Sequence, residues 1–197
     1  MAWKREPLIE DELNQLLDAA DRHDLEHKTT IRVLAHTGMR ADEFAHMRSG
    51  WVDWQDELVR VPAFEDCNCS NCAQKAAARN ADIEQMWIPK TEHGARTIPL
   101  KEPDTLRTLR DYFSHHETIG VTRQTIGNRV KRVASDTEIR KKITPHVLRH
   151  TYGTLIAARG ATPQYIRQTM GHADLSSAND YLQYAGTQLD AEAEELW

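Results

Sequence analysis

The sequence predicts an α+β domain that is mainly α-helical, with a small three-stranded antiparallel sheet. Two patterns predict this fold class. Apolar residues recur at helical spacing between recognisable caps along most of the chain, and three short runs near its middle have the composition of strands. With 197 residues the chain can bury a core, and we expect one domain over residues 1–197. Within it we expect a cysteine-containing insertion at 62–85 and a C-terminal tail helix at 187–197.

The composition is that of an ordinary globular protein, with 40% hydrophobic and 28% charged residues. The sequence has no apolar run of about 18 residues and no signal-peptide pattern. We therefore expect a cytoplasmic protein with no membrane partner. The three cysteines all lie between positions 67 and 72, which does not fit the disulfide framework of a secreted protein.

Helix signals come first in the chain, and strand signals follow. Asp11 is a candidate N-cap for a helix over 11–23, and a second helix over 27–37 is closed by Gly38. The segment 90–95 contains a glycine and predicts a hairpin turn between the last two strands. The three expected strands are 58–61, 86–89 and 96–100.

The second half of the chain returns to helical periodicity. The windows 103–116 and 122–133 each carry an apolar stripe, and the segment 144–184 has the caps of three short helices. Pro at a first helical position and Gly after a last one are the expected start and stop residues. These caps are, in order, Thr144 with Pro145 and Gly160, Thr162 with Pro163 and Gly171, and Ser176 or Ser177.

Polar side chains that suit a phosphodiester gather on these three helices. His146, Arg149 and His150 share one face of the first helix, because they are three and four residues apart. His172 follows the second helix, and Tyr181 lies on the third. The segment therefore presents imidazoles, a guanidinium and a phenol together.

The same residues carry a resemblance to a known family. His146-x-x-Arg149-His150, then Gly171-His172, then Tyr181 nine residues after His172 resembles the C-terminal half of the tyrosine recombinase (phage-type integrase) signature. It implies the catalytic fold of these DNA breaking-rejoining enzymes. The resemblance runs from about Leu8 to Tyr184, so we expect the family's N-terminal core-binding domain to be absent, in either a catalytic fragment or a minimal form.

Two earlier segments carry the resemblance further. TGMRADEF, residues 37–44, resembles the family's first box, which implies that Arg40 binds phosphate and that Glu43 supports it. A guanidinium is always charged and offers paired donors to two phosphate oxygens, which lysine cannot do. WIPKTEHGARTIPL, residues 87–100, is similar to the hairpin that carries the family's catalytic lysine, which implies that role for Lys90.

The resemblance implies a site-specific recombinase or integrase that cleaves and rejoins DNA strands through a 3′-phosphotyrosyl intermediate. No cofactor is expected for catalysis. The implied partner is double-stranded DNA, on which a homo-oligomer, either a dimer or a tetramer, is expected. The implied nucleophile is Tyr181, with His146 as its base and Lys90 as proton donor to the leaving oxygen. Arg40 and Arg149 would bind the phosphate, and His172 would either hydrogen-bond the phosphate or position the tyrosine. Glu43 and His150 are the implied supporting residues.

A second tyrosine competes for the role of nucleophile. Tyr184 lies three residues after Tyr181 on the same expected helix, so both could face the same side. The resemblance favours Tyr181. Packing favours it too, since a buried stripe of Leu182, Ala185 and Leu189 would leave Tyr181 free.

The distribution of charge answers an objection to DNA as the partner. The net charge is −5, but residues 121–150 hold eight basic and two acidic residues, a local net charge of +6. A concentrated basic stripe on an acidic body is typical of a surface that binds the DNA backbone. The candidate DNA-binding residues are Arg123, Arg129, Lys131, Arg132, Lys141 and Lys142.

The insertion contains a candidate metal site. Cys67, Cys69 and Cys72 lie within six residues, and three thiols so close in a reducing compartment suggest a structural zinc ion. A fourth ligand would come from elsewhere, with His93 and Asp66 as candidates. The alternative, free thiols in an exposed loop, has equal support from the sequence.

Two other functions remain open from the sequence. A type IB topoisomerase would use the same chemistry to relax supercoiled DNA. A non-catalytic DNA-binding regulator is the other, because residues 162–184 resemble a helix-turn-helix around Gly171 and His172. On that view Arg40 and Lys90 would be incidental.

Overall fold

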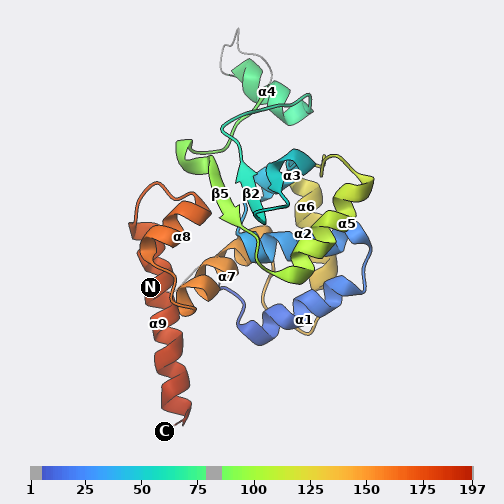
Figure 1. Ribbon diagram of the computed structural model, residues 1–197. Coiled ribbons are helices and arrows are strands. Elements are labelled where there is room, and N and C mark those ends of the chain that lie inside the picture. The colour runs from blue at the N-terminus through green and yellow to red at the C-terminus, as the bar shows by residue number, and fades with distance from the viewer. Residues whose placement is uncertain (1–5, 79–85, 197) are drawn as a thin grey trace.

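A bundle of helices around one central, buried helix forms the body of the protein. The computed structural model describes residues 6–78 and 86–196, without the side chains of 75, 78 and 188–196. Helix α2 (Leu25–Thr37) lies at the centre, and its residues from Thr29 to Ala35 are all buried. Figure 1 shows it among the four helices that pack on it: α1 (Glu10–Asp21), α5 (Pro103–His115), α6 (Arg123–Ala134) and α7 (Pro145–Ala158).

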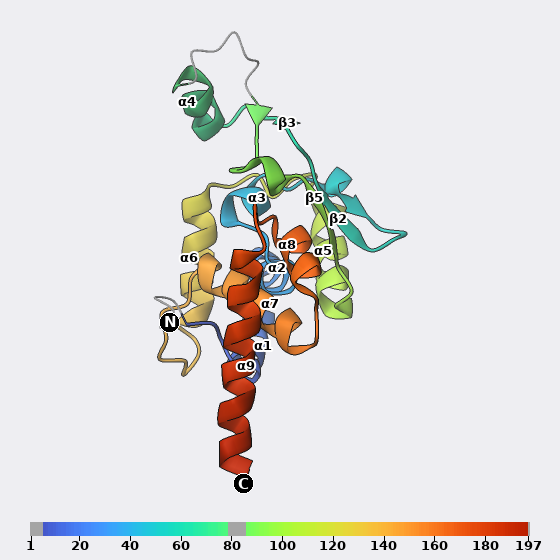
Figure 2. The same ribbon diagram turned by 90° about the vertical axis from the view of Figure 1, so that its left-hand side faces the viewer.

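A second, smaller apolar cluster joins the last three helices. Helices α8 (Pro163–Met170) and α9 (Ser176–Leu196) pack on each other and on α7. The C-terminal half of α9 projects away from the body (Figure 2). Residues 187–196 are helical, as expected for the C-terminal tail, but they continue α9 without a break and do not begin a helix of their own. The buried members of this cluster are Tyr152, Ala157, Ile166, Met170, Ala178, Tyr181 and Ala185.

Most of the expected helix caps are confirmed. The hydroxyls of Thr122, Thr144 and Thr162 each accept a hydrogen bond from the backbone N–H three residues on. Gly38 and Gly171 end their helices in the left-handed region, with φ of 60° and 64°. Two helices are exceptions. The N-cap of the first is Ile9 and not Asp11; the Glu12 carboxylate accepts the Ile9 N–H at 3.1 Å, so the cap lies two residues earlier than expected. At α9 neither Ser176 nor Ser177 is the cap, because both lie within the helix and their backbone N–H groups donate to Asp174 Oδ1.

The three-stranded antiparallel sheet is present, but one of its strands is not the expected one. Its order is β1 (Val52–Asp53), β2 (Leu58–Val61) and β5 (Arg96–Pro99), with Val59 opposite Ile98. The expected strand at 86–89 forms only β4 (Met86–Trp87), which pairs with β3 (Glu65–Asp66) in a separate two-stranded sheet.

The predicted hairpin over 90–95 is consequently wrong. Pro89 has no N–H to donate to a strand ladder, and a Cβ at Gly94 would lie 2.1 Å from Pro89 Cβ. The chain therefore folds Gly94 against Pro89 and passes through the 3₁₀ turn η2 (Glu92–Gly94) before β5 begins. Trp87 is buried and turned toward α3 (Ala41–Ala45), where its Nε1–H donates to Asp42 Oδ2 at 3.2 Å.

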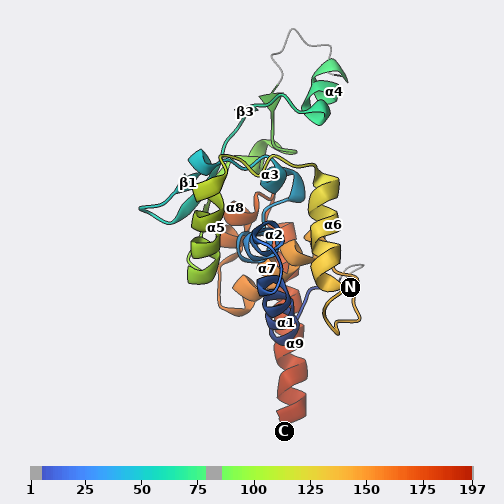
Figure 3. The same ribbon diagram turned by 90° about the vertical axis from the view of Figure 1, so that its right-hand side faces the viewer.

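The insertion stands above this body. It contains β3 and α4 (Ser70–Ala78), and α4 lies at one end of the molecule, beyond α3 (Figures 1 and 3). The α4 helix packs mainly on β4. The insertion therefore rests on a short ladder and not on the helical core.

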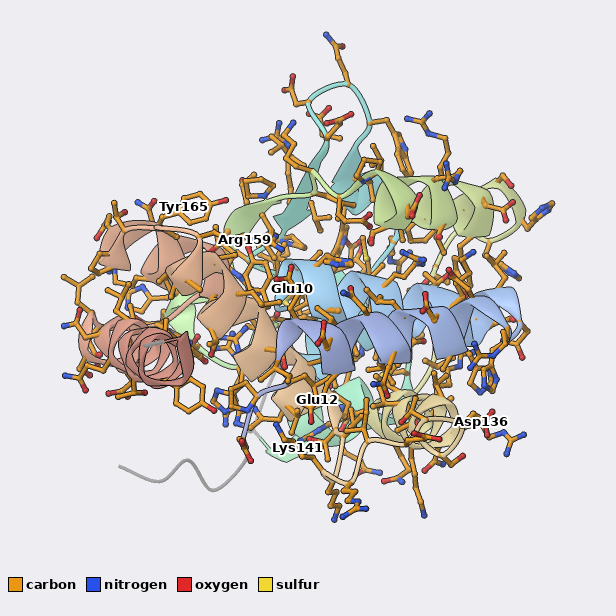
Figure 4. The ribbon with its side chains drawn as sticks, turned by 90° about the horizontal axis from the view of Figure 1, so that it is seen from below. Glu10, Glu12, Asp136, Lys141, Arg159 and Tyr165 are labelled. Atoms are coloured by element: carbon orange, nitrogen blue, oxygen red, sulfur yellow. The ribbon has the colours of Figure 1, made fainter. Side chains whose placement is uncertain are left out.

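Ion pairs fasten the N-terminal helix to segments far along the chain. Lys141 Nζ lies 2.8 Å from Glu12 Oε2, and Arg159 Nη2 lies 3.0 Å from Glu10 Oε1 (Figure 4). The first pair joins α1 to the segment before α7, and the second joins it to Arg159, the C-cap of α7. Across residues 6–78 and 86–196, no helix combines the length and the apolar character that crossing a bilayer requires.

Candidate active site

An open cleft of about 2310 Å³ collects the side chains that the sequence singles out. It lies between α3, the segment before η2, α6, α7 and α9. Its lining includes all six predicted catalytic residues, although they are spread over more than 140 positions of the chain. These residues are Arg40, Lys90, His146, Arg149, His172 and Tyr181, with His150 beside them.

Glu43 organises the basic side chains of the cleft. Its buried carboxylate accepts hydrogen bonds from Arg40 Nη1 at 2.8 Å and from Arg96 Nη2 at 2.8 Å, and it also accepts the Arg40 backbone N–H. Burial alone would raise the pKa of Glu43, but the charges of Arg96 and Arg40 outweigh it and lower the pKa to about 2. The prediction that Glu43 supports Arg40 agrees with this geometry.

Arg96 is a member of the site that sequence reasoning missed. Its side chain is only 4% exposed, and it donates to Thr169 O at 2.7 Å and Gly94 O at 2.8 Å besides the Glu43 carboxylate. It therefore joins β5 to α8 and α3. A signal was available: Arg96 shares the inward face of its strand with Ile98, two residues on, and a charge on that face needs a buried partner.

Arg149 is buried in the floor of the cleft. Its guanidinium donates to Gly38 O at 2.5 Å and also to Met170 O, so it links α7 to the ends of α2 and α8. Burial, reinforced by the nearby charge of Arg40, lowers the pKa of Arg149 to about 9, so the side chain stays protonated at neutral pH. Arg40, Arg96 and Arg149 surround the single carboxylate of Glu43, which leaves a local charge of +2.

Tyr181 lies in this basic field with its hydroxyl on a chain of two imidazoles. Tyr181 Oη is 3.0 Å from His150 Nδ1, and His150 Nε2 is 2.8 Å from the Nε2 of the exposed His146. The tyrosine is only 3% exposed, so the expectation that packing leaves it free is wrong. Burial, with a contribution from Asp180, raises the pKa of Tyr181 to about 12 against the opposing charge of Arg149.

Gly153 explains how the tyrosine ring fits against α7. A Cβ at position 153 would lie 2.6 Å from Tyr181 Cε1 and 2.9 Å from Met170 Sδ. The bare backbone therefore makes the slot into which the Tyr181 ring packs. Tyr184 is half-buried and is not among the described residues that line the cleft. The side chain of Leu189, in the expected stripe, lies outside the described residues.

His172 covers the other face of the tyrosine. The two ring centroids are 5.8 Å apart and the planes are inclined by 11°. Burial and the charges of Arg149 and Arg40 lower the pKa of His172 to about 4, so its imidazole is neutral at pH 7. Arg40 Nη2 donates to the carbonyl of the preceding Gly171 at 3.1 Å, which ties this turn to the arginine site.

The predicted DNA-binding residues fall into four groups. Arg123 and Lys142 line the cleft, and Lys131 and Arg132 are exposed on α6 outside it. Lys141 also borders the cleft, but its ammonium pairs with Glu12 and Glu6. Arg129 is half-buried. A role in DNA binding stays a prediction for all six basic residues.

Lys90 is exposed at the cleft edge, as a group that meets a substrate should be.

The cysteines meet a histidine that sequence reasoning did not select. His46, Cys67, Cys69 and Cys72 offer ligand atoms that all lie within 4.8 Å of one another. The candidates His93 and Asp66 do not belong to this group. His46 precedes Cys67 by 21 residues, and nothing in its local sequence marks it as a ligand.

Comparison with known proteins gives a consistent family match. Residues 6–187 match the model of the phage integrase family. The tyrosine recombinase XerD of Haemophilus ducreyi is 28% identical over 188 residues, which cover 92% of this chain and 59% of that protein. XerD of Neisseria meningitidis is 26% identical over 191 residues, covering 95% and 62%. The chain thus spans about 60% of the length of these curated relatives.

Solved structures show the same fold. The crystal structure of XerA recombinase has a TM-score of 0.72 at 21% identity, covering 98% of this chain and 66% of that one. XerH recombinase in a post-cleavage complex with a palindromic difH substrate has a TM-score of 0.65 at 16% identity, covering 95% and 52%. At these identities the likeness establishes the architecture of the domain.

Proposed function

Since this chain belongs to the phage integrase family, we propose that it is a site-specific recombinase that cleaves and rejoins DNA strands through a 3′-phosphotyrosyl intermediate. One observation carries the proposal: the Tyr181 hydroxyl shares a cleft with two arginines, Arg40 and Arg149, in a local field of net charge +2. A phosphodiester carries one negative charge and gains more as it is attacked. The field therefore favours the transition state over the substrate.

In the proposed reaction Tyr181 Oη attacks the phosphorus of the scissile phosphate. The bond from phosphorus to the 5′-oxygen breaks, and the 3′-phosphate remains on the tyrosine. Arg40 and Arg149 donate to the non-bridging oxygens, and Lys90 gives a proton to the departing 5′-oxygen. Rejoining is the same sequence reversed with a new 5′-hydroxyl, so no energy source and no cofactor are assigned to these steps.

The tyrosine proton has a defined first acceptor. His150 Nδ1 is the imidazole nitrogen within hydrogen-bond reach of Tyr181 Oη, and His146 stands next in line at the exposed end. We therefore assign the proton to His150 first, with His146 passing it toward solvent. This order differs from the expectation that His146 acts on the tyrosine directly.

The partners follow from the same proposal. In related solved structures, XerH is bound to a difH substrate and a λ integrase dimer is bound to a core site. By analogy we assign double-stranded DNA to the cleft of this protein, in the cytoplasm, and a dimer or tetramer of the chain on the DNA. The projecting half of α9 is the element available for contact between copies.

Covalent capture tests the proposal and does not require a known target sequence. The protein is incubated with a pool of nicked random duplexes, and adducts are separated on a denaturing gel and sequenced. The wild type and Tyr184→Phe should form adducts with one shared sequence, and Tyr181→Phe should form none. Sequence-selective binding with no adduct would favour the helix-turn-helix regulator, and an adduct on Tyr181→Phe would overturn the choice of nucleophile.

A further inference from the structure

We propose that His46, Cys67, Cys69 and Cys72 bind one zinc ion. This ion fastens the insertion to α3, the helix whose N-cap is Arg40. The His46 Nε2 atom lies 3.5 Å from Cys69 Sγ and 3.5 Å from Cys72 Sγ. A tetrahedral zinc with bonds of about 2.3 Å to sulfur and 2.0 Å to nitrogen places those atoms about 3.5 Å apart. The two distances from His46 thus match such an ion, and the sulfur of Cys67 lies within 4.8 Å of the other three ligand atoms.

The histidine is oriented for this role. His46 Nδ1 lies 2.7 Å from the carbonyl oxygen of Asp42, which can only accept, so Nδ1 carries the proton. The lone pair of Nε2 is then directed at the thiols. In zinc sites, the hydrogen bond that a histidine ligand donates from its other ring nitrogen fixes the ring in this way. Trp87 stacks on the imidazole, with ring centroids 5.6 Å apart, and holds it in place.

The thiols come from a loop and the helix that follows it. Cys69 Sγ accepts the Cys72 backbone N–H at 3.4 Å across the start of α4, and Cys72 is buried. Three sulfurs and one nitrogen in a tetrahedral arrangement favour zinc among the common divalent metals. Four protein ligands leave no open position, so the ion is structural and takes no part in the cleavage chemistry.

The insertion needs such a fastening because its apolar packing is poor. Phe64 is 63% exposed, and among the described side chains of α4 only Cys72 is buried. Small units that cannot bury a core are commonly held by a metal or disulfides. Through His46 the ion is tied to α3, which begins beside Arg40, and through Trp87 to the strand that precedes Lys90. It therefore fixes the spacing of the two sides of the cleft.

The first test measures metal in the intact protein. Protein purified without chelators should contain about one zinc per chain, and X-ray absorption at the zinc edge should report three sulfurs and one nitrogen. His46→Ala should weaken zinc binding at least about 100-fold, beyond the 10–100-fold typical of residues that only orient a ligand. His93→Ala and Asp66→Asn are matched controls and should keep wild-type affinity.

A second measurement locates the consequence. Removing zinc from the wild type should speed hydrogen exchange in 64–73 and 86–90 and leave α2 and α7 unchanged. Zinc-free protein, a disulfide among the three cysteines after anaerobic purification, or wild-type affinity in His46→Ala would each overturn the proposal. The absorption spectrum requires no variant, so a misfolded variant cannot leave the question open.

Discussion

The helical body and the insertion place polar side chains at the same cleft by different means. In the body, Arg149 and Glu43 are buried beneath the cleft by elements that pack on the apolar core, with the helix α2 at its centre. In the insertion, β3 and α4 bury little, and the polar cluster of His46 and three cysteines takes the place of a core. The comparison teaches that apolar packing holds the charged groups of the body, whereas the insertion would depend on the cross-link that the proposed zinc ion supplies.

The two regions also differ in charge. Residues 62–85 contain four acidic and two basic residues, a net charge of −2, against +6 for residues 121–150. In the proposed complex, the α6 side of the cleft would therefore attract the DNA backbone, whereas the insertion side would repel it.

The largest expected effect comes from removing the proton donor between the two regions. Lys90 is exposed, so Lys90→Ala should leave the fold and the zinc content unchanged while slowing strand cleavage about 10²–10⁴-fold. A duplex with sulfur in place of the scissile 5′-oxygen has a leaving group that needs no proton, and it should restore most of the rate. If the variant stays slow on that duplex, Lys90 is not the donor.

A next-largest effect should appear in the stability of the body. Glu43→Gln removes the carboxylate between Arg40 and Arg96 and should lower the free energy of unfolding by about 3–5 kcal/mol, as for other buried pairs that lose one partner. Glu65→Gln is the matched change in the insertion, where the side chain is partly exposed, and should cost at most about 1 kcal/mol. Denaturant unfolding measures both, and equal losses would contradict the contrast between the two regions.

Acid should weaken the body through the same carboxylate. The pKa of Glu43 is about 2 in the folded protein and 4.5 ordinarily, so its pairing stabilises the fold above pH 4.5 and the contribution disappears as pH falls toward 2. The full contribution is ~3 kcal/mol. The difference in unfolding free energy between wild type and Glu43→Gln should therefore shrink below about pH 4.5. A difference that is independent of pH would show that the charge of Glu43 is not what stabilises the fold.

The smallest expected effect concerns DNA affinity. Arg123→Glu with Lys142→Glu, both on the cleft wall, should weaken binding to all duplexes and reduce the slope of log affinity against log salt by about 2. Lys131→Glu with Arg132→Glu, which lie on α6 outside the cleft, should change the slope less. Fluorescence anisotropy at several salt concentrations compares the two pairs. A larger loss from the second pair would move the DNA path away from the cleft.

Local signals in the sequence were sufficient for most of the fold. The threonine caps, the prolines after them and the glycines at 38 and 171 depend on neighbouring residues alone, and the helices begin and end close to where these predict. The pairing partner of the strand at 86–87 depends instead on where Trp87 is buried, which is set by tertiary packing. The periodicity of the local sequence could not predict that partner.

The candidate site was predictable to the extent that a motif marks it. The predicted catalytic residues meet in one cleft. Arg96 lies within the segment 87–100 that carries the resemblance but received no role, and His46 stands in no motif; both matter because of what lies across from them. The burial of Tyr181 was also missed, because it depends on Gly153, a residue whose importance is the absence of a side chain.

The hydrogen bonds of the arginine site join residues that the ribosome adds to the chain at different times. Arg40 bonds to Gly171 across 131 residues of chain, Arg149 to Gly38 across 111, and Arg96 to Glu43 across 53. A ribosome adds about 5–20 residues per second, so Arg40 waits several seconds for Gly171. Tyr181 emerges later still. A growing chain therefore exposes Arg40 before it holds the carbonyl of Gly171, whereas Gly38 and Glu43 are already present when Arg149 and Arg96 are added. The proposed strand cleavage becomes possible only after Tyr181 has joined the cleft.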